Sequence, residues 1–80
     1  MGRAVNYEML YREINLPDIE LVSAKVHEAW IESKRAQRVT SRKSETGEEL
    51  MVPYDQLSEG AKDLDRQMVR AVYAAIKAAA

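Results

Sequence analysis

The sequence predicts a small, mainly helical α+β domain, in which two main helices flank a short β-hairpin and a short N-terminal helix precedes them. Two stretches, 17–37 and 58–76, repeat apolar residues with the 3.6-residue period of an amphipathic helix. Between them, two short runs flank a glycine-containing loop, a pattern typical of a hairpin. We expect one domain from 80 residues, because so short a chain buries only about 60% of its unfolded surface.

The first 16 residues are expected to be an extension of the core, which we place at 17–76. Within this extension, four apolar residues recur at the spacing of one helical face: Tyr7, Leu10, Tyr11 and Ile14. A proline disfavours helical geometry in the residue before it, so this short helix should end at Asn15-Leu16-Pro17.

Pro17 suits the first turn of the next helix, and Asp18 and Glu20 would place negative charge at the positive end of its dipole. We expect about five turns, with His27 beside the apolar stripe rather than at its centre. The residues predicted to form that stripe are Ile19, Val22, Val26 and Trp30, with Ala29 alongside.

The predicted hairpin pairs 38–43 with 49–52 around the loop 44–48, which contains Gly47. A two-stranded hairpin is not stable alone, so Leu50 and Val52 should pack on the helices. Asp55 and Ser58 are credible caps for a last helix from Glu59 into the closing alanines. Its predicted core stripe is Ala61, Leu64, Met68, Ala71, Val72, Ala75 and Ile76, whereas 77–80 should fray or dock on a partner.

Composition argues against several classes of protein. The chain has no cysteine and no apolar run of the roughly 20 residues that span a membrane, and its start lacks the features of a secretion signal, so we expect a soluble cytoplasmic protein. Twelve basic and thirteen acidic side chains nearly cancel, which argues against nucleic acid as the partner. A core this small is helped by a second chain, so we also expect a homo-oligomer.

Two motifs, taken together, resemble the RyR domain, the module repeated in ryanodine receptors and also found alone in bacterial and phage proteins. The first is His27-Glu28-Ala29-Trp30, followed by a basic position at Arg35. The second is Leu50-x-Val52-Pro53-Tyr54-x-x-Leu57, followed by a helix containing Lys62, Asp65, Arg66 and Val69. The resemblance runs from about residue 17 to residue 74. It fails at Gln37-Arg38-Val39-Thr40, where the family usually has Gly-Trp followed by Tyr-Gly.

The resemblance implies two helices flanking a small hairpin, usually paired with a second copy about a two-fold axis. In the receptors, tandem repeats hold an adenine nucleotide, and the tryptophans of the His-x-x-Trp elements stack on the base. Prokaryotic members are mostly inferred to sense or bind nucleotide-like signals. A single copy therefore suggests a homodimer or higher oligomer that supplies Trp30 twice.

The sequence allows two roles for each of Trp30 and His27. The Trp30 ring could stack on a purine, or it could simply be core, since it falls on the apolar stripe. His27 could hydrogen-bond a ligand, or it could be a partly buried imidazole capped by Tyr54 or by a backbone carbonyl. It is not a zinc ligand on this evidence, because the chain offers no second histidine and no cysteine.

The remaining candidate ligand contacts are also ambiguous. Arg35, Arg38 and Arg42 belong to a block that holds five of the twelve cations within residues 34–43; it could clamp phosphate or form a solvated face. Tyr54 could be structural or could line a pocket. Arg66 could form an ion pair within the domain or face an anion.

We therefore predict a non-enzymatic nucleotide-binding module that binds an adenine-containing nucleotide or a cyclic nucleotide signal. It would sense that signal, or sequester it in the setting of phage and bacterial defence. The alternative is a protein interaction or scaffold module without nucleotide binding. We expect no catalytic residue, metal or cofactor, because the sequence shows no nucleophile-base pairing, no metal-ligand set and no glycine-rich phosphate loop.

Overall fold

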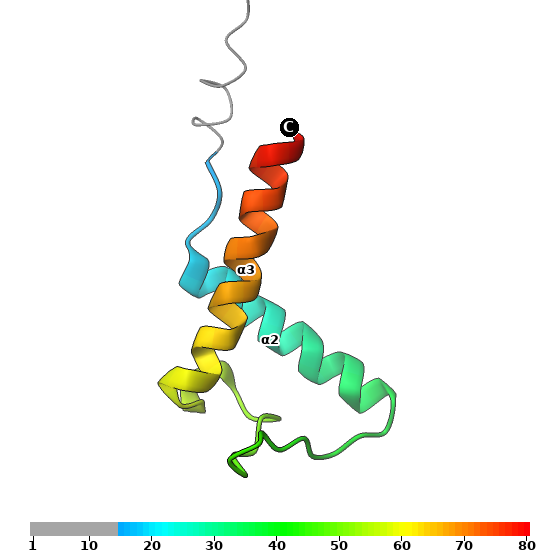
Figure 1. Cartoon of the computed structure of the whole chain (residues 1–80). Helices are drawn as coiled ribbons and strands as arrows, with labels where there is room; N and C mark the ends of the chain where they lie inside the picture. The colour runs from blue at the N-terminus through cyan, green and yellow to red at the C-terminus, as the bar shows by residue number, and fades with distance from the viewer. Residues whose placement is uncertain (1–14) are drawn as a thin grey trace, which may run out of the picture.

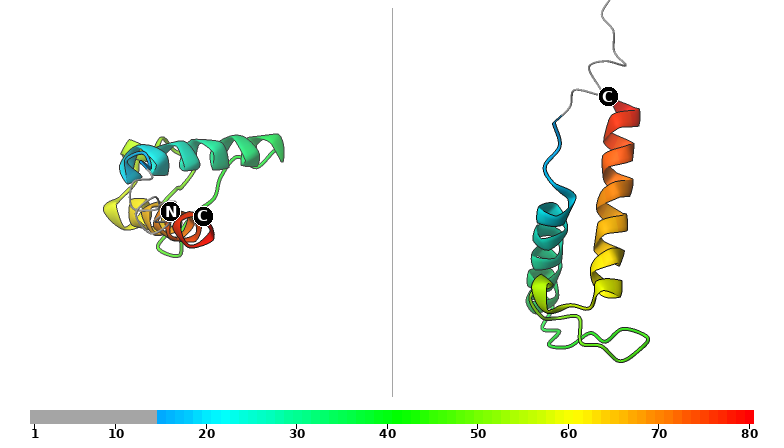
Figure 2. Two further views of the ribbon diagram at one scale, coloured as in Figure 1. Left: turned by 90° about the horizontal axis from the view of Figure 1, so that it is seen from above. Right: turned by 90° about the vertical axis from the view of Figure 1, so that its left-hand side faces the viewer.

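The computed structural model describes residues 15–80, and the N-terminal helix predicted at 7–14 lies outside them. The described chain contains helix α2 (Ile19–Ala36), a 3-10 turn η1 (Tyr54–Gln56) and helix α3 (Glu59–Ala79). Figure 1 shows α3 crossing α2, and Figure 2 shows the two helices in adjacent layers with the connecting segment at one end. Both main helices predicted from the sequence are therefore confirmed.

Both helices begin at side-chain caps. Asp18 accepts hydrogen bonds from the backbone N–H groups of Glu20 and Leu21, at 3.0 and 3.3 Å, so Pro17 precedes the cap rather than occupying the first turn as predicted. Ser58 caps α3 by accepting from the Ala61 N–H at 3.2 Å. The alanine-rich end continues the helix to Ala79, in keeping with the high helix propensity of alanine.

α2 ends in a Schellman motif, in which the N–H of Val39 bonds to the Lys34 carbonyl at 2.9 Å and the N–H of Arg38 bonds to the Arg35 carbonyl at 2.9 Å. Arg38 adopts the left-handed backbone conformation that this motif requires, with a φ of 62°. Glycine usually occupies this position, because a Cβ atom is strained there.

The predicted β-hairpin is wrong as a pair of strands. Residues 15–80 contain no strand, and the hairpin is reduced to one isolated antiparallel bridge between Lys43 and Glu49. The Glu49 carboxylate accepts hydrogen bonds from the Ser41 hydroxyl and from the N–H groups of Arg42 and Met51. Because a side chain takes donors that a strand ladder would use, the segment folds as a loop.

The predicted core stripe of α2 is also wrong. The buried positions of this helix are Ser23, His27 and Ile31, whereas Val26 is exposed and Trp30 is half-buried. His27 therefore lies at the centre of the buried face rather than beside it. The apolar part of the core is small, and its members are Ile31, Tyr54, Leu57 and Val69.

The predicted core stripe of α3 faces outward over most of its length. Its large side chains retain much of their exposure: Leu64 66%, Met68 63%, Val72 52% and Ile76 41%. Val69, which the periodicity left outside the stripe, is the buried residue of α3. The helix is amphipathic as predicted, but no part of the described chain fully covers its apolar face.

Candidate functional site

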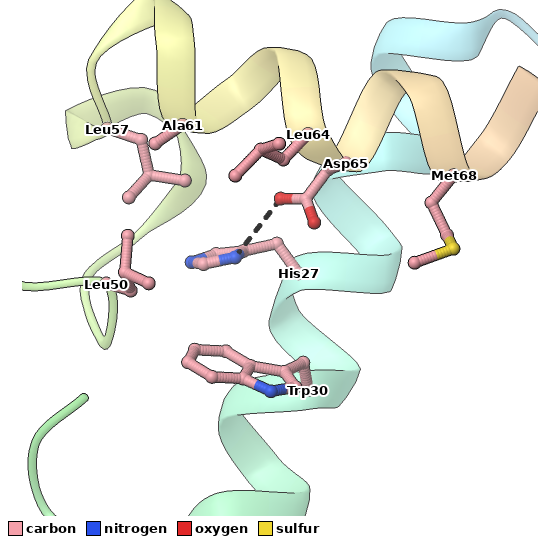
Figure 3. A pocket seen from close by; sticks show the side chains of 8 residues that line it. All are labelled: His27, Trp30, Leu50, Leu57, Ala61, Leu64, Asp65 and Met68. Atoms are coloured by element: carbon pink, nitrogen blue, oxygen red, sulfur yellow. Dashed lines mark ion pairs between the residues drawn. The ribbon is translucent and has the colours of Figure 1, made fainter. Parts of the chain in front are cut away.

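A groove of about 230 Å³ lies where α2, α3 and the connecting segment meet (Figure 3). Its wall is mostly apolar, and the polar atoms come from His27 and Asp65. The lining residues are His27 and Trp30 from α2, Leu50 and Leu57 from the connection, and Ala61, Leu64, Asp65 and Met68 from α3. The site therefore forms only when the three segments pack together.

His27 fixes the floor of this groove. It is 5% exposed, and its Nε2 lies 2.8 Å from the carbonyl oxygen of Val52. A carbonyl only accepts hydrogen bonds, so Nε2 must carry a proton and donate it. The bond ties α2 to the segment that leads into η1.

The other ring nitrogen, Nδ1, faces the Asp65 carboxylate of α3 at 3.3 Å, as the dashed line in Figure 3 marks. Burial raises the pKa of Asp65, whereas the neighbouring His27 opposes that rise. One proton between these two groups is needed to complete the contact. It can rest on the imidazole, giving an ion pair, or on the carboxyl, giving a neutral hydrogen bond.

The indole of Trp30 stacks on this fixed imidazole. The ring centroids are 5.6 Å apart and the planes make an angle of 30°. Figure 3 shows His27 above Trp30, with the Asp65 carboxylate on the opposite side of the imidazole. An aromatic ring that is half-buried and held against a buried neighbour presents a pre-ordered surface, which lowers the entropy lost when another ring stacks there.

Tyr54 and Arg66, two of the predicted ligand contacts, lie instead in a polar cluster that joins α2, η1 and α3. The Tyr54 hydroxyl donates to Glu20 Oε1 at 2.9 Å. Arg66 binds both oxygens of the same carboxylate, at 2.7 and 2.9 Å, and reaches Glu59 at 2.9 Å. Of the two roles considered for Arg66, the structure shows the ion pair, formed with Glu20 and Glu59 rather than with its neighbour in sequence.

This cluster changes the acidity of its members. Hydrogen bonds from Arg66 and then from Tyr54 lower the pKa of Glu20 from 4.5 to about 2. The pKa of Arg66 is raised by the same contact with Glu20 and by Glu59. Burial, followed by the hydrogen bond to Glu20, raises the pKa of Tyr54. All three contacts favour the charged carboxylate and the protonated phenol, so the cluster is held together at neutral pH.

The three predicted arginines of the basic block do not line the groove that holds Trp30. Arg35 lines a separate hollow with Glu28, Glu32, Ile31 and Pro53. Arg38 and Arg42 are exposed at the end of α2 and in the following loop. Of the seven predicted residues, His27 and Trp30 line this groove. Tyr54 packs beside His27, with ring centroids 6.2 Å apart, and the four arginines lie elsewhere.

Sequence reasoning missed most of the groove wall. Leu64 and Met68 were assigned to the core because they follow the helical period, and Leu50 was expected only to pack on the helices. All three are large apolar residues, and that was the one signal in the sequence that could have pointed to them. What was lacking was any indication of which apolar positions would stay uncovered.

A second, more polar hollow of about 700 Å³ adjoins the first and shares Leu50, Ala61 and Leu64 with it. Its other lining residues come from the loop and from the start of α3: Lys43, Ser44, Glu45, Thr46, Glu48, Ser58 and Gly60. Within residues 15–80, no three histidine, cysteine or acidic side chains are placed to hold a metal ion. No helix in that range is long and apolar enough to cross a membrane.

No family model matches the sequence, and neither the curated proteins nor the solved structures contain a match to it.

Proposed function

We propose that the chain is a non-enzymatic module that binds a nucleotide-like ligand, either an adenine-containing nucleotide or a cyclic nucleotide signal. One observation carries the proposal: a half-buried indole, stacked on a buried imidazole, forms part of the wall of an apolar groove. A purine could stack on that indole, an interaction that contributes about 1–3 kcal/mol per base in other proteins.

The resemblance to the RyR domain supports the same proposal. In the ryanodine receptors the tryptophan of the His-x-x-Trp element stacks on an adenine base, and here the matching residue is Trp30. The aliphatic groove wall, formed by Leu50, Leu64 and Met68, would cover the rest of a flat heterocycle. Sensing the signal and sequestering it are the two uses that we propose for such binding.

Trp30 is the only tryptophan in the chain, so its fluorescence reports directly on the groove. We expect adenine nucleotides and cyclic nucleotides to quench this fluorescence in a saturable way and to raise the melting temperature, because they bind only the folded state. Guanine and pyrimidine counterparts would show how far the groove selects the base. The proposal would be refuted if the protein is folded and none of these ligands quenches its fluorescence in a saturable way at millimolar concentration.

Two variants separate ligand binding from folding. Trp30→Ala should abolish the ligand-induced rise in melting temperature while the protein remains helical by circular dichroism. Val26→Ala, which shortens an exposed side chain one turn away on α2, is the matched control and should bind as the parent protein does. Equal loss of binding in both variants would indicate that the groove does not hold the ligand.

A second candidate function, protein interaction, is favoured by the exposed stripe of α3. The partner that we propose is a second copy of this chain, because the stripe is symmetric about position 70. Leu64 and Ile76 lie six residues on either side of that position, and Met68 and Val72 lie two. Two antiparallel α3 helices could therefore pair like with like about a two-fold axis.

Self-association is tested by light scattering across a range of protein concentrations. We expect a weak dimer, since an interface limited to one face of a single helix falls at the small end of specific interfaces. Met68→Glu should give a monomer, because it would bury a charge near the axis. Gln67→Glu adds the same charge at the neighbouring exposed position and is the control.

A further inference from the structure

The two adjoining hollows differ in chemistry, and the difference bears on which ligand fits. The hollow at Trp30 is almost wholly apolar, whereas the one beyond Leu50 and Leu64 adds hydroxyl and charged side chains to a lining that is otherwise apolar. A nucleoside has the same division, with a flat base at one end and a hydroxyl-bearing sugar at the other. A base placed on Trp30 would direct its sugar and any phosphate toward the polar hollow.

The charges lining the polar hollow do not favour a polyphosphate. Lys43 is its one cation among the described residues, and Glu45 and Glu48 belong to the same lining. The lining therefore carries a net charge of −1, from one positive and two negative side chains. A linear triphosphate carries three or four negative charges, and like charges brought together raise the free energy of binding.

Glu48 cannot easily turn away or lose its charge. Its carboxylate accepts hydrogen bonds from the Ser58 N–H at 2.8 Å and from the Ser58 hydroxyl at 2.7 Å. These two bonds lower the pKa of Glu48, so the group is ionised at neutral pH. The contact also secures the first turn of α3 against the loop, and this makes the negative charge a fixed part of the hollow.

The arginines that could have offset this charge lie elsewhere. Arg35 lines a hollow that shares no residue with either of these two, and Arg66 is bound to Glu20 and Glu59. Arg38 and Arg42 line neither hollow. The lining also includes three hydroxyl side chains, Ser44, Thr46 and Ser58, which already bond within the chain: Ser44 to Thr46 at 2.9 Å and Ser58 to Glu48 at 2.7 Å.

We propose that the groove selects a nucleoside-type ligand with at most one phosphate charge per base, such as a nucleoside or a cyclic nucleotide, over linear nucleoside polyphosphates. The base stacks on Trp30, and the sugar lies over the polar hollow next to Lys43 and Thr46. This inference rests on the proposed nucleotide-binding function and narrows it to a ligand class.

The test is a titration of Trp30 fluorescence with adenosine, cyclic AMP and ATP without magnesium, at low and at high salt. We expect adenosine and cyclic AMP to bind with similar dissociation constants, and ATP to bind roughly tenfold more weakly at low salt. The difference should narrow at high salt, because screening weakens the repulsion. ATP binding as tightly as adenosine would overturn the inference and leave the proposed function standing, whereas no binding of any of the three would overturn both.

A charge reversal makes the test specific to the polar hollow. Glu45→Lys changes its lining from one cation and two carboxylates to two cations and one carboxylate, so ATP binding should strengthen several-fold while adenosine binding is unchanged. Glu32→Lys makes the same change in the separate hollow that holds Arg35, and it should leave the ratio of ATP to adenosine affinity as it was. An equal response to both variants would show that phosphate does not reach the polar hollow, and the inference would fall.

Discussion

The two flanks of the helix crossing differ in how they are held. On one flank, Tyr54, Glu20 and Arg66 join all three described elements through hydrogen bonds and ion pairs. On the other, the large apolar residues Leu64 and Met68 remain mostly exposed. Polar contacts thus hold the helices together on one flank, whereas large apolar side chains stay exposed to solvent on the other. In most helical pairs the apolar side chains are the ones that are buried between the helices.

In this protein the most apolar side chains of α3 are not the ones that hold it against α2. Polar contacts require partners at fixed distances and angles, so they set how α3 lies on α2. Apolar contacts are non-directional, and those on the open flank can be satisfied by a ligand or by a second chain.

Removing His27 should be the most damaging single change. His27→Ala would leave the Val52 carbonyl and the Asp65 carboxyl without their partner and would open a cavity at the crossing. We expect a loss on the order of 3 kcal/mol in the free energy of unfolding. Met68→Ala, on the open flank, should cost under about 1 kcal/mol. Urea unfolding of both variants measures the difference, and similar costs would mean that the open flank also holds the fold.

Acid should weaken the polar flank first. Glu20 on this flank has a pKa lowered from 4.5 to about 2 in the folded protein, and so does Glu49 in the connecting segment. Between these values the unfolded chain binds more protons than the folded one, so stability is present above pH 4.5 and falls as the pH drops toward 2.

Glu20→Gln should flatten that fall, because glutamine has no proton to gain. Thermal melts of both proteins between pH 6 and pH 2 measure the effect. Glu28→Gln is the matched control, since Glu28 is an exposed glutamate on the same helix whose nearest cation, Lys25, is 4.0 Å away. The same pH dependence in the parent protein and in Glu20→Gln would argue that the cluster contributes nothing to folding.

Changing Ser23, which is buried where the helices cross, should have a smaller effect on stability. Its side chain is fully buried, and its hydroxyl has no hydrogen-bond partner among the described residues. Burying an unpaired hydroxyl costs free energy, so Ser23→Ala should raise the free energy of unfolding by about 1 kcal/mol. Ser33→Ala, at an exposed position of the same helix, should change it little. A loss of stability in Ser23→Ala would show that the hydroxyl has a partner.

The smallest expected effect lies outside the crossing, at the end of α2. Arg38 has a left-handed backbone conformation, in which a Cβ atom costs about 1–2 kcal/mol. Arg38→Gly removes this strain, but glycine loses more backbone entropy on folding, so the net gain should be under about 1 kcal/mol. The same variant tests Arg38 as a predicted phosphate contact. Unchanged cyclic AMP binding together with a higher melting temperature would show that Arg38 does not contact the phosphate.

Local features of the sequence were sufficient for the helices. The two stretches with the 3.6-residue period predicted α2 and α3, and Ser58 was a credible cap, but Pro17 was placed in the first turn of α2 although Asp18 caps that helix. The same reasoning failed for the hairpin, because it credited Val39 and Thr40 with strand formation. It had no means of knowing that the Glu49 side chain accepts a hydrogen bond from the Arg42 N–H of the facing segment and one from the Met51 N–H of its own.

The candidate site was predictable in part. The pairing of His27 with Trp30 follows from their spacing, since residues three apart lie on one side of a helix. The roles of Tyr54 and Arg66 did not follow, because their partner Glu20 is 34 and 46 residues away in the sequence. Such a contact depends on where two helices cross.

Local sequence was enough to predict that two helices form, that His27 and Trp30 share a side of the first, and that the chain carries little net charge. Which apolar face is covered, which arginine is paired and where a hollow remains became known from the packing of the segments. The reason is that helix formation depends on neighbours within a few residues, whereas coverage depends on the relative placement of segments far apart in the chain.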